Sequence, residues 1–514
     1  MNPLAGVVAF VAVSAVTVGI GAFGLRISRT TGDFYVASRT VRPLANASAI
    51  GGEYLSAASF LGVAGLVLTR GADSLWYPVG WTAGYLVLLV FVAAPLRRSG
   101  AYTLPDFAQL RVESARARAV SSVLVVLIGV LYLVPQLQGA GLTLRTLTGA
   151  PPWVGEVTVA LVVLLIVASG GMRSITLVQA FQYWLKLVAL LLPVCFLLVS
   201  WRRHAVPTAG RLEVADWVEP LSGPHPLYLT YSLILATFLG TMGLPHVVVR
   251  FYTNRDGRAA RRTTVAVLGL LSCFYLLPPL YGVLGRVYAF DLVASGRGDS
   301  VVLELPSRVL GGTGGDLLTA LLGAGAFAAF LSTSSGLVVS IGGVVSQDLL
   351  SRRLDGVLAF RVASSLGALV TLGLTLASSG LAVAHAVELA FAVAASTFCP
   401  LLLLGIWWRG LTAAGAVAGL VAGGTLSTTG VLMTMFGATP PGWPGAVLAQ
   451  PALITVPVGF AVMTAVSLVT RRPLQVSRTM VRLHTPEHLP LDRGTYHPEA
   501  RREETGPSEV ADRV

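Results

Sequence analysis

Long apolar runs separated by short polar segments extend along this chain to about residue 470. Thirteen of the runs are long enough to cross a bilayer as helices, because one crossing needs about 20 apolar residues. They cover residues 4–25, 44–68, 75–96, 119–144, 153–170, 177–200, 228–249, 263–287, 314–345, 357–378, 382–407, 412–434 and 451–470. The pattern therefore predicts an all-α polytopic membrane protein with about 13 transmembrane helices.

The composition and the charge support a membrane protein. The chain has 514 residues, 54% of them hydrophobic and 12% charged, with a mean hydropathy of +0.75, which is too apolar for a soluble protein of this size. The net charge of +12 comes largely from arginines in the short polar segments between the runs. Membrane topology explains these arginines better than nucleic-acid binding does, so we expect a lipid bilayer and no nucleic acid as partner.

Most of the arginines fall in alternate polar segments, which gives the chain an orientation. The positive-inside rule predicts a multi-pass protein of the cell membrane with its N-terminus outside and its C-terminus in the cytoplasm. The first run has no basic residue before Arg26 and exceeds the core of a signal peptide, so we expect it to remain as a spanning helix. The polar tail at 474–514 predicts a disordered cytoplasmic extension.

The run at 44–68 contains polar residues where a simple spanning helix needs only apolar ones. Gly51 and Gly52 are adjacent, Glu53 follows them, and Ser56 lies three residues further on. Paired glycines let a helix open, and open backbone is tolerated in a membrane only around an enclosed polar site. We therefore interpret the run as a helix broken at the glycine pair around a ligand. The alternative is a continuous helix whose glycines permit close packing.

A second interruption lies in the run at 228–249. Gly240, Gly243 and Pro245 occur together there, and His246 adds a polar group. This pattern is also that of an ordinary proline kink, but it lies five runs after the first interruption. Two interrupted helices at corresponding places in two five-helix units indicate an inverted-repeat transporter with its substrate at the midplane. His246 either donates a hydrogen bond to substrate or contacts a neighbouring helix.

A third polar group lies in the run at 314–345. Ala329, Ser332 and Thr333 stand at positions i, i+3 and i+4, so one carbonyl and two hydroxyls share a helical face. Neutral oxygens of this kind suit a hard cation such as sodium. The alternative is that both hydroxyls bond back to the preceding turn of their own helix. The sequence contains no phosphate-binding GxxxxGK[ST] motif and no recognisable nucleophile–base pair, so we expect an ion gradient as the energy source and no enzymatic activity.

Five stretches together resemble the sodium:solute symporter family, and within it the cation/acetate symporter branch. They are GGEYLSAASFLG (51–62), RSGAYTLPDFAQLR (98–111), GGMRSITLVQAFQ (170–182), GLPHVVVRFYT (243–253) and the AxxST of 329–333, fifteen residues ahead of Asp348. The resemblance covers about residues 30–430 and implies a leucine-transporter-type fold of two inverted five-helix repeats. The units it implies are a first helix and cytoplasmic loop (1–43), the two repeats (44–200 and 228–407), two further helices (412–470) and the tail (474–514).

The resemblance also implies roles for individual residues. Sodium would bind to main-chain oxygens and hydroxyls of Gly52, Leu55, Ala329, Ser332 and Thr333. The substrate would lie near Glu53, Tyr54, Ser56, Gly243 and His246. Glu53 and Leu55 stand where acetate carriers have aspartate and methionine; leucine supplies the same carbonyl, whereas the longer acid leaves substrate size and proton involvement open.

We therefore expect a sodium-coupled symporter that imports a small monocarboxylate such as acetate, propionate or pyruvate, with Na⁺ as coupling ion and no covalent cofactor. No arginine is predicted at the midplane, so positive helix ends and free N–H groups would hold the carboxylate. The alternatives are a sodium- or proton-coupled symporter for an amino acid, a sugar, urea or a vitamin, and a membrane solute sensor. The sequence leaves the oligomeric state open.

Overall fold

The computed structural model describes residues 3–25, 41–169, 172–203, 215–221, 224–350, 354–378, 382–470 and 476–486, and these residues form helices and short connections without any strand. The helices of the first part are α1 Pro3–Leu25, α3 Pro43–Tyr54, α4 Val63–Arg70, α5 Trp76–Val87, α6 Ala93–Ser99, α7 Leu104–Val112, α8 Ala115–Thr148, α9 Pro152–Ser169 and α10 Met172–Arg203. The helices of the second part are α11 Ala215–Val218, α12 Pro226–Gly243, α13 Pro245–Val249, α14 Gly257–Tyr275, α15 Leu277–Tyr288, α16 Asp291–Ala294, α17 Val301–Leu310, α18 Gly312–Val345, α19 Gly356–Ala377, α20 Val383–Trp407, α21 Ala413–Met435, α22 Trp443–Ala449, α23 Ala452–Val469 and α24 Val476–His484. Short π-helical turns lie at Ala58–Gly62, Leu88–Val92 and Ser346–Leu350, and 3₁₀ turns at Gly71–Leu75, Arg250–Thr253 and Gly298–Ser300.

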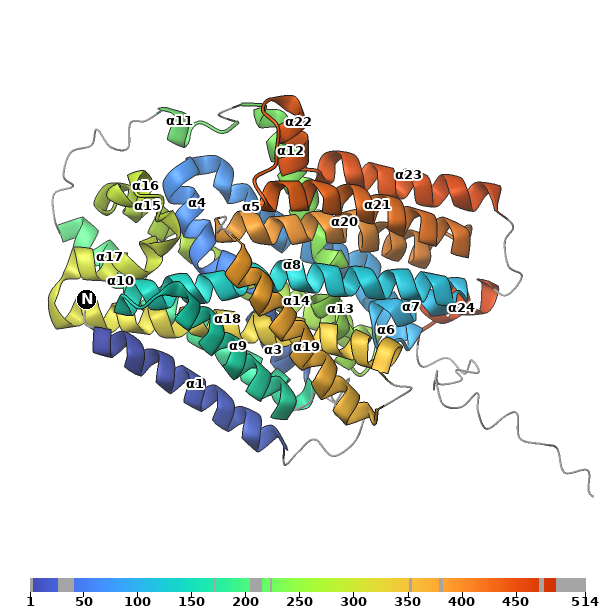
Figure 1. Cartoon of the computed structure of the whole chain (residues 1–514), viewed down its shortest axis with the longest axis horizontal. Helices are drawn as coiled ribbons and strands as arrows, with labels where there is room; N and C mark the ends of the chain where they lie inside the picture. The colour runs from blue at the N-terminus through green and yellow to red at the C-terminus, as the bar shows by residue number, and fades with distance from the viewer. Residues whose placement is uncertain are drawn as a thin grey trace, which may run out of the picture.

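The long helices run roughly side by side along the longest axis of the molecule (Figure 1). Helix α18 is the most enclosed of them, because every residue from Leu322 to Val344 is buried. It contacts α3, α8 and α10, which places it at the centre of the bundle. A helix that is buried on all sides in this way forms the core of a large helical protein.

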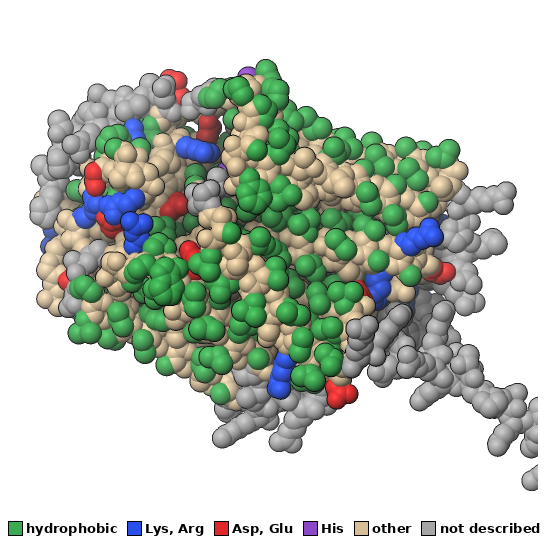
Figure 2. Space-filling view, viewed as in Figure 1, with side chains coloured by type: hydrophobic (Ala, Val, Ile, Leu, Met, Phe, Trp, Pro, Cys, Tyr) green, Lys and Arg blue, Asp and Glu red, His purple; other side chains and the backbone are tan. Residues whose placement is uncertain are grey.

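The outer surface of the bundle is apolar. Hydrophobic side chains cover much of the face drawn in Figure 2, and the charged side chains gather mainly toward the two ends of the long axis. In the described part of the chain, 11 helices or joined helices are long and apolar enough to cross a membrane. A surface of this kind suits lipid, and the protein is a multi-pass membrane protein.

Every predicted apolar run falls on a helix or on two consecutive helices. Residues 58–99 count as one of the 11 candidate spans. A turn at Gly71 divides this span, because Gly71 has a φ of 73° and any Cβ there would overlap the carbonyl oxygen of Trp217. The helix of the run at 153–170 is shorter than the others, at Pro152–Ala168. The number of crossings therefore stays a prediction.

The predicted disorder of the tail from residue 474 is wrong for its first part. Helix α24 packs against α6 and α7, with Leu483 fully buried and Met480 nearly so. These two apolar residues are three positions apart, so they lie on one face of this short amphipathic helix. Residues 487–514 lie outside the described part of the chain.

Candidate functional site

The first broken helix is interrupted at Leu55 and Ser56, where the chain leaves helical geometry between α3 and the π-helical turn at Ala58–Gly62. The predicted break at Gly51 and Gly52 is therefore wrong in position, since both glycines are helical. A Cβ on Gly52 would overlap the carbonyl oxygen of Gln179, so the glycine lets α3 approach the α10 backbone closely. Close packing explains the pair, and the opening follows one turn later.

The break frees main-chain carbonyls, and side chains from other helices bind them. In a continuous helix the Gly52 and Glu53 carbonyls would accept from the N–H groups of residues 56 and 57. The Ala57 N–H donates instead to Oε1 of Gln136 at 2.9 Å. The Ser332 hydroxyl donates to the Gly52 carbonyl at 2.7 Å, and the Thr333 hydroxyl donates to the Glu53 carbonyl at 2.6 Å. Helix α18 is thereby joined to the open end of α3.

The two hydroxyls thus do more than bond back to their own helix. Ser332 also reaches the Ala329 carbonyl at 3.0 Å, whereas Thr333 bonds across to α3. All three residues are completely buried. We call the carbonyls of Gly52, Leu55 and Ala329 together with the hydroxyls of Ser332 and Thr333 the α3–α18 junction. It contains every residue that the sequence assigned to sodium, and their sodium-binding role stays a prediction.

The side chain of Lys186 extends from α10 into this junction. Its Nζ donates to the Leu55 carbonyl at 2.8 Å, to the Ser332 hydroxyl at 2.6 Å, and to the Gly52 carbonyl. Lys186 is fully buried. Sequence reasoning missed this residue, although a signal existed: Lys186 is the only lysine in the chain and lies within a predicted span, where an ionisable side chain is a functional candidate.

Glu53, next to Gly52 in α3, forms a buried ion pair. Its carboxylate accepts from Nε of Arg250 at 2.6 Å, and both side chains are almost inaccessible to solvent. Arg250 also donates to the Thr176 hydroxyl at 2.8 Å and to Oε1 of Gln179. Gly336 of α18 makes room for the carboxylate, because a Cβ there would overlap it. Arg250, expected in a loop, is thus a buried arginine directly after the second broken helix.

The second broken helix is interrupted where the sequence indicated. Helix α12 ends at Gly243, Leu244 is extended with φ −72° and ψ 117°, and α13 begins at Pro245. Proline suits the first position of α13 because that position needs no N–H donor. Gly240 and Gly243 face the backbone of α20 at Phe391 and Ala394. They allow α12 and α20 to pack closely; a contact of Gly243 with substrate stays a prediction.

Aromatic side chains fill the space between the two breaks. Tyr54 contacts Tyr85 with ring centroids 4.9 Å apart, and Phe391 lies 5.8 Å from both Trp81 and Tyr132. His246 packs on Tyr132 at 5.1 Å. We call these six residues the aromatic cluster. Tyr77, Trp81 and Tyr85 recur every four residues, a spacing that could have predicted one aromatic face on α5.

Several polar atoms of the aromatic cluster have no protein partner. Within the described residues, Nε1 of Trp81, the hydroxyl of Tyr85 and both ring nitrogens of His246 are buried without a hydrogen bond. Such groups normally have partners, because burying them unpaired costs roughly 1–3 kcal/mol each. Ser56 is also buried, in the break itself. The structure therefore brings Tyr54 and His246 of the predicted substrate residues into one cluster, while the Glu53 carboxylate is paired with Arg250.

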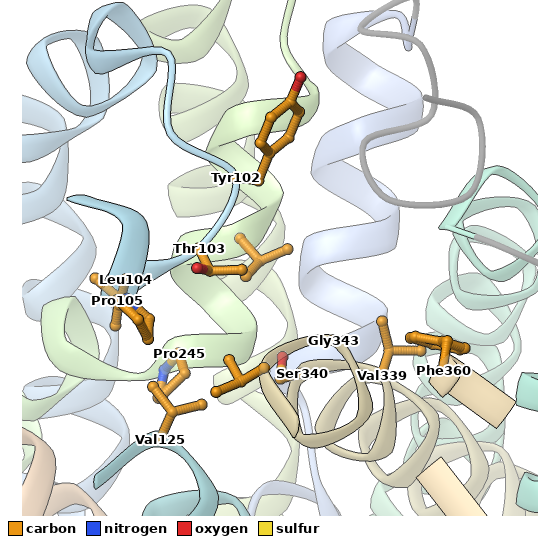
Figure 3. Close-up of a pocket in the computed structure, with 12 residues that line it drawn as sticks. Tyr102, Thr103, Leu104, Pro105, Val125, Pro245, Val339, Ser340, Gly343 and Phe360 are labelled. Carbon is orange, nitrogen blue, oxygen red and sulfur yellow. The ribbon is translucent and has the colours of Figure 1, made fainter. Parts of the chain in front are cut away.

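A small cavity reaches the second break from the loop before α7. Tyr102, Thr103, Leu104, Pro105 and Pro245 are among the residues that line it (Figure 3). Its remaining lining residues are Val125, Val249, Val339, Ser340, Gly343, Val344 and Phe360. The cavity therefore lies between the loop, α7, α8, α13, α18 and α19, and it includes Pro245, the first residue of α13 after the break.

The solved structures similar to this chain share its fold. A Na⁺-coupled sialic acid symporter in a substrate-bound outward-open state has a TM-score of 0.66 and 16% identity, covering 90% of this chain and 98% of that one. Mhp1, a nucleobase-cation-symport-1 family transporter, has a TM-score of 0.54 and 15% identity, covering 88% and 99%. MhsT in complex with L-phenylalanine has a TM-score of 0.52 and 16% identity, covering 82% and 98%. The predicted leucine-transporter-type fold is confirmed.

Comparisons with known sequences agree with these structural comparisons. The chain is 32% identical over 475 residues to the uncharacterized symporter YwcA of Bacillus subtilis (strain 168), covering 88% of this chain and 91% of that relative. Neither this relative nor the structures support the acetate branch in particular. Residues 34–423 match the sodium:solute symporter family. The chain belongs to the sodium:solute symporter family.

Proposed function

We propose that this protein is a secondary transporter that couples the downhill movement of a cation to the import of a small organic solute by alternating access. One relationship carries the proposal: the two broken helices lie against each other. The Tyr54 hydroxyl, at the end of α3, shares a hydrogen bond of 2.8 Å with the Thr241 hydroxyl near the end of α12. Interrupted helices that meet in this way form the substrate and ion sites of inverted-repeat transporters.

The α3–α18 junction is the cation site in this proposal. It offers main-chain carbonyls and hydroxyls, which are the oxygen types that hard cations prefer. Family membership and the Na⁺-coupled sialic acid symporter both support Na⁺ as the coupling ion. A cation there would hold the broken α3 against α18, so its release would allow the two to separate.

The aromatic cluster is the solute site. Its unpaired Trp81 N–H and Tyr85 hydroxyl are hydrogen-bond donors, and His246 carries one N–H in either neutral tautomer. Donors without partners favour a solute that brings acceptors, and a carboxylate has two acceptor oxygens on a small body. We therefore keep acetate, propionate or pyruvate as the proposed cargo, which is the cargo that the sequence resemblance implies.

The experiment is solute uptake by the purified full-length chain in proteoliposomes. Labelled acetate, propionate, pyruvate, proline, glucose and urea are offered separately, with an inward Na⁺ gradient, an inward H⁺ gradient, or no gradient. We expect gradient-driven accumulation of the monocarboxylates and not of glucose or urea. Accumulation of a different solute would overturn the cargo. Equilibration of solutes without any gradient dependence would overturn coupled transport.

A further inference from the structure

We propose that the cation at the α3–α18 junction is the ammonium group of Lys186, and that this side chain takes the place of a sodium ion there. This inference rests on the proposed function and names the cation at its cation site. Its basis is geometric: the only lysine of the chain is fully buried, and its Nζ lies among the oxygens that the sequence assigned to sodium.

The ammonium group and a sodium ion compete for the same space. Nζ donates to the Gly52 carbonyl, the Leu55 carbonyl and the Ser332 hydroxyl, so three N–H donors meet three acceptors. A hard cation of similar size to Ca²⁺ lies roughly 2.3–2.6 Å from its oxygen ligands. A sodium ion bound by these oxygens would therefore overlap Nζ, and Lys186 would first have to leave the junction.

The charges around Lys186 leave it without an ion pair. On α3, the nearest carboxylate is that of Glu53, which Arg250 from the second broken helix holds at 2.6 Å. The buried stretch of α18, from Leu322 to Val344, contains no ionisable residue, and neither does α1. Helix α15 presents the phenol of Tyr281, which donates to α10 at the Leu190 carbonyl, and α10 itself adds Tyr183. Among the described residues no carboxylate pairs with Lys186, so main-chain dipoles and a hydroxyl alone hold its charge.

Sodium binding tests the inference on the purified full-length chain, without any solute. We expect no saturable ²²Na⁺ binding to the wild type. Saturable binding to the wild type that Ser332→Ala abolishes would overturn the inference. Lys186→Met leaves the carbonyls without the ammonium group and should gain saturable binding. Gln182→Met is the matched control, because Gln182 lies one turn away on α10 and bonds to Thr17 of α1; it should not gain binding. The wild-type result decides the question even if Lys186→Met fails to fold.

Nuclear magnetic resonance gives a second test. Because the chain has one lysine, protein labelled with ¹⁵N at the lysine side chain gives a single resonance. We expect this resonance to stay in place when NaCl replaces KCl. A resonance that moves when NaCl replaces KCl would overturn the inference. Neither measurement needs transport, so lack of uptake in proteoliposomes would overturn the proposed function alone, whereas wild-type ²²Na⁺ binding together with Na⁺-driven uptake would overturn this inference alone.

Discussion

Glu53 and Arg250 are 197 residues apart in the chain and form a buried ion pair in which Nε of Arg250 donates to the carboxylate at 2.6 Å. Glu53 lies in the last turn before the first break, and Arg250 follows α13 directly after the second. The pair therefore connects the two broken helices. A second link, between Tyr54 of the aromatic cluster and Thr241, also connects them.

Removing one member of this pair should destabilise the protein strongly. Glu53→Gln leaves the Arg250 charge buried and unpaired, which costs about 3–5 kcal/mol. We expect a clearly lower melting temperature in detergent. The double variant Glu53→Gln, Arg250→Gln removes both charges and should recover part of the loss.

The control is Asp291→Asn, which weakens an ion pair with Arg308 at the surface. Asp291 is 61% exposed, and exposed pairs contribute little because water screens them. We expect almost no change in the melting temperature. A Glu53→Gln variant as stable as Asp291→Asn would contradict the structural role of the buried pair.

Trp81→Phe should weaken solute binding. The substitution keeps an aromatic ring but removes an unpaired buried N–H, and a hydrogen bond to a charged partner contributes roughly 1.5–3 kcal/mol. We expect the KM for the transported monocarboxylate to rise by about tenfold or more. Trp76→Phe, on the same helix but 38% exposed, is the matched control and should leave KM unchanged. Equal KM values for the two variants would argue against Trp81 as a solute contact.

Gly52→Ala should damage the fold, because the added methyl group meets the rigid backbone of α10 at Gln179. Overpacking of this kind costs about 1–3 kcal/mol or more. We expect lower yield of folded protein in size-exclusion chromatography and lower uptake. Gly373→Ala, in α19, adds the same group where nothing lies within 4 Å and should behave as wild type. A normal Gly52→Ala protein would mean that α3 and α10 are more widely spaced than described.

Asp299 should make stability depend on pH. It lies in the 3₁₀ turn Gly298–Ser300, outside the spanning helices, and its carboxylate accepts from the N–H of Val383 at 3.0 Å. Burial raises the pKa of this carboxyl to about 6. The folded state therefore binds the proton more tightly than the unfolded state, and the stability that this gives is present at low pH and lost as pH rises through about 6.

Asp299→Asn should remove this dependence, so that the variant melts at a higher temperature than wild type above about pH 6. Asp291→Asn provides a control of opposite sign, because hydrogen bonds from Arg308 hold the pKa of Asp291 below its ordinary value. That variant should lose very little stability at neutral pH, because the pair is exposed. Melting curves of the two variants that respond to pH in the same direction would contradict both assignments.

The apolar pattern predicted the helical bundle well, because crossing a bilayer requires long runs that few other folds contain. The break at Leu244 could also be predicted from the sequence, since Pro245 cannot continue α12. The break at Leu55 was misplaced to Gly51 and Gly52, because sequence does not distinguish a glycine that opens a helix from one that faces another backbone.

The ionisable groups were harder to place. Lys186 and Arg250 act through partners on other helices more than 70 residues away, and no local pattern reports such partners. The position of Lys186 within a predicted span was the one available signal. Helix α24 was missed for a related reason. In its described part only Met480 and Leu483 are buried, and their burial depends on the surface that α6 and α7 provide.

The docked α24 has a practical meaning for handling this protein. The main-chain oxygen of His484 accepts from Arg98 at 3.4 Å, and its imidazole ring lies 5.0 Å from the ring of Trp407. Cutting the chain after α23 would expose the apolar surface of α6 and α7 that Leu483 covers, and we expect the shortened protein to self-associate. Affinity tags and fluorescent fusions should therefore be attached beyond residue 486, where α24 still covers this surface.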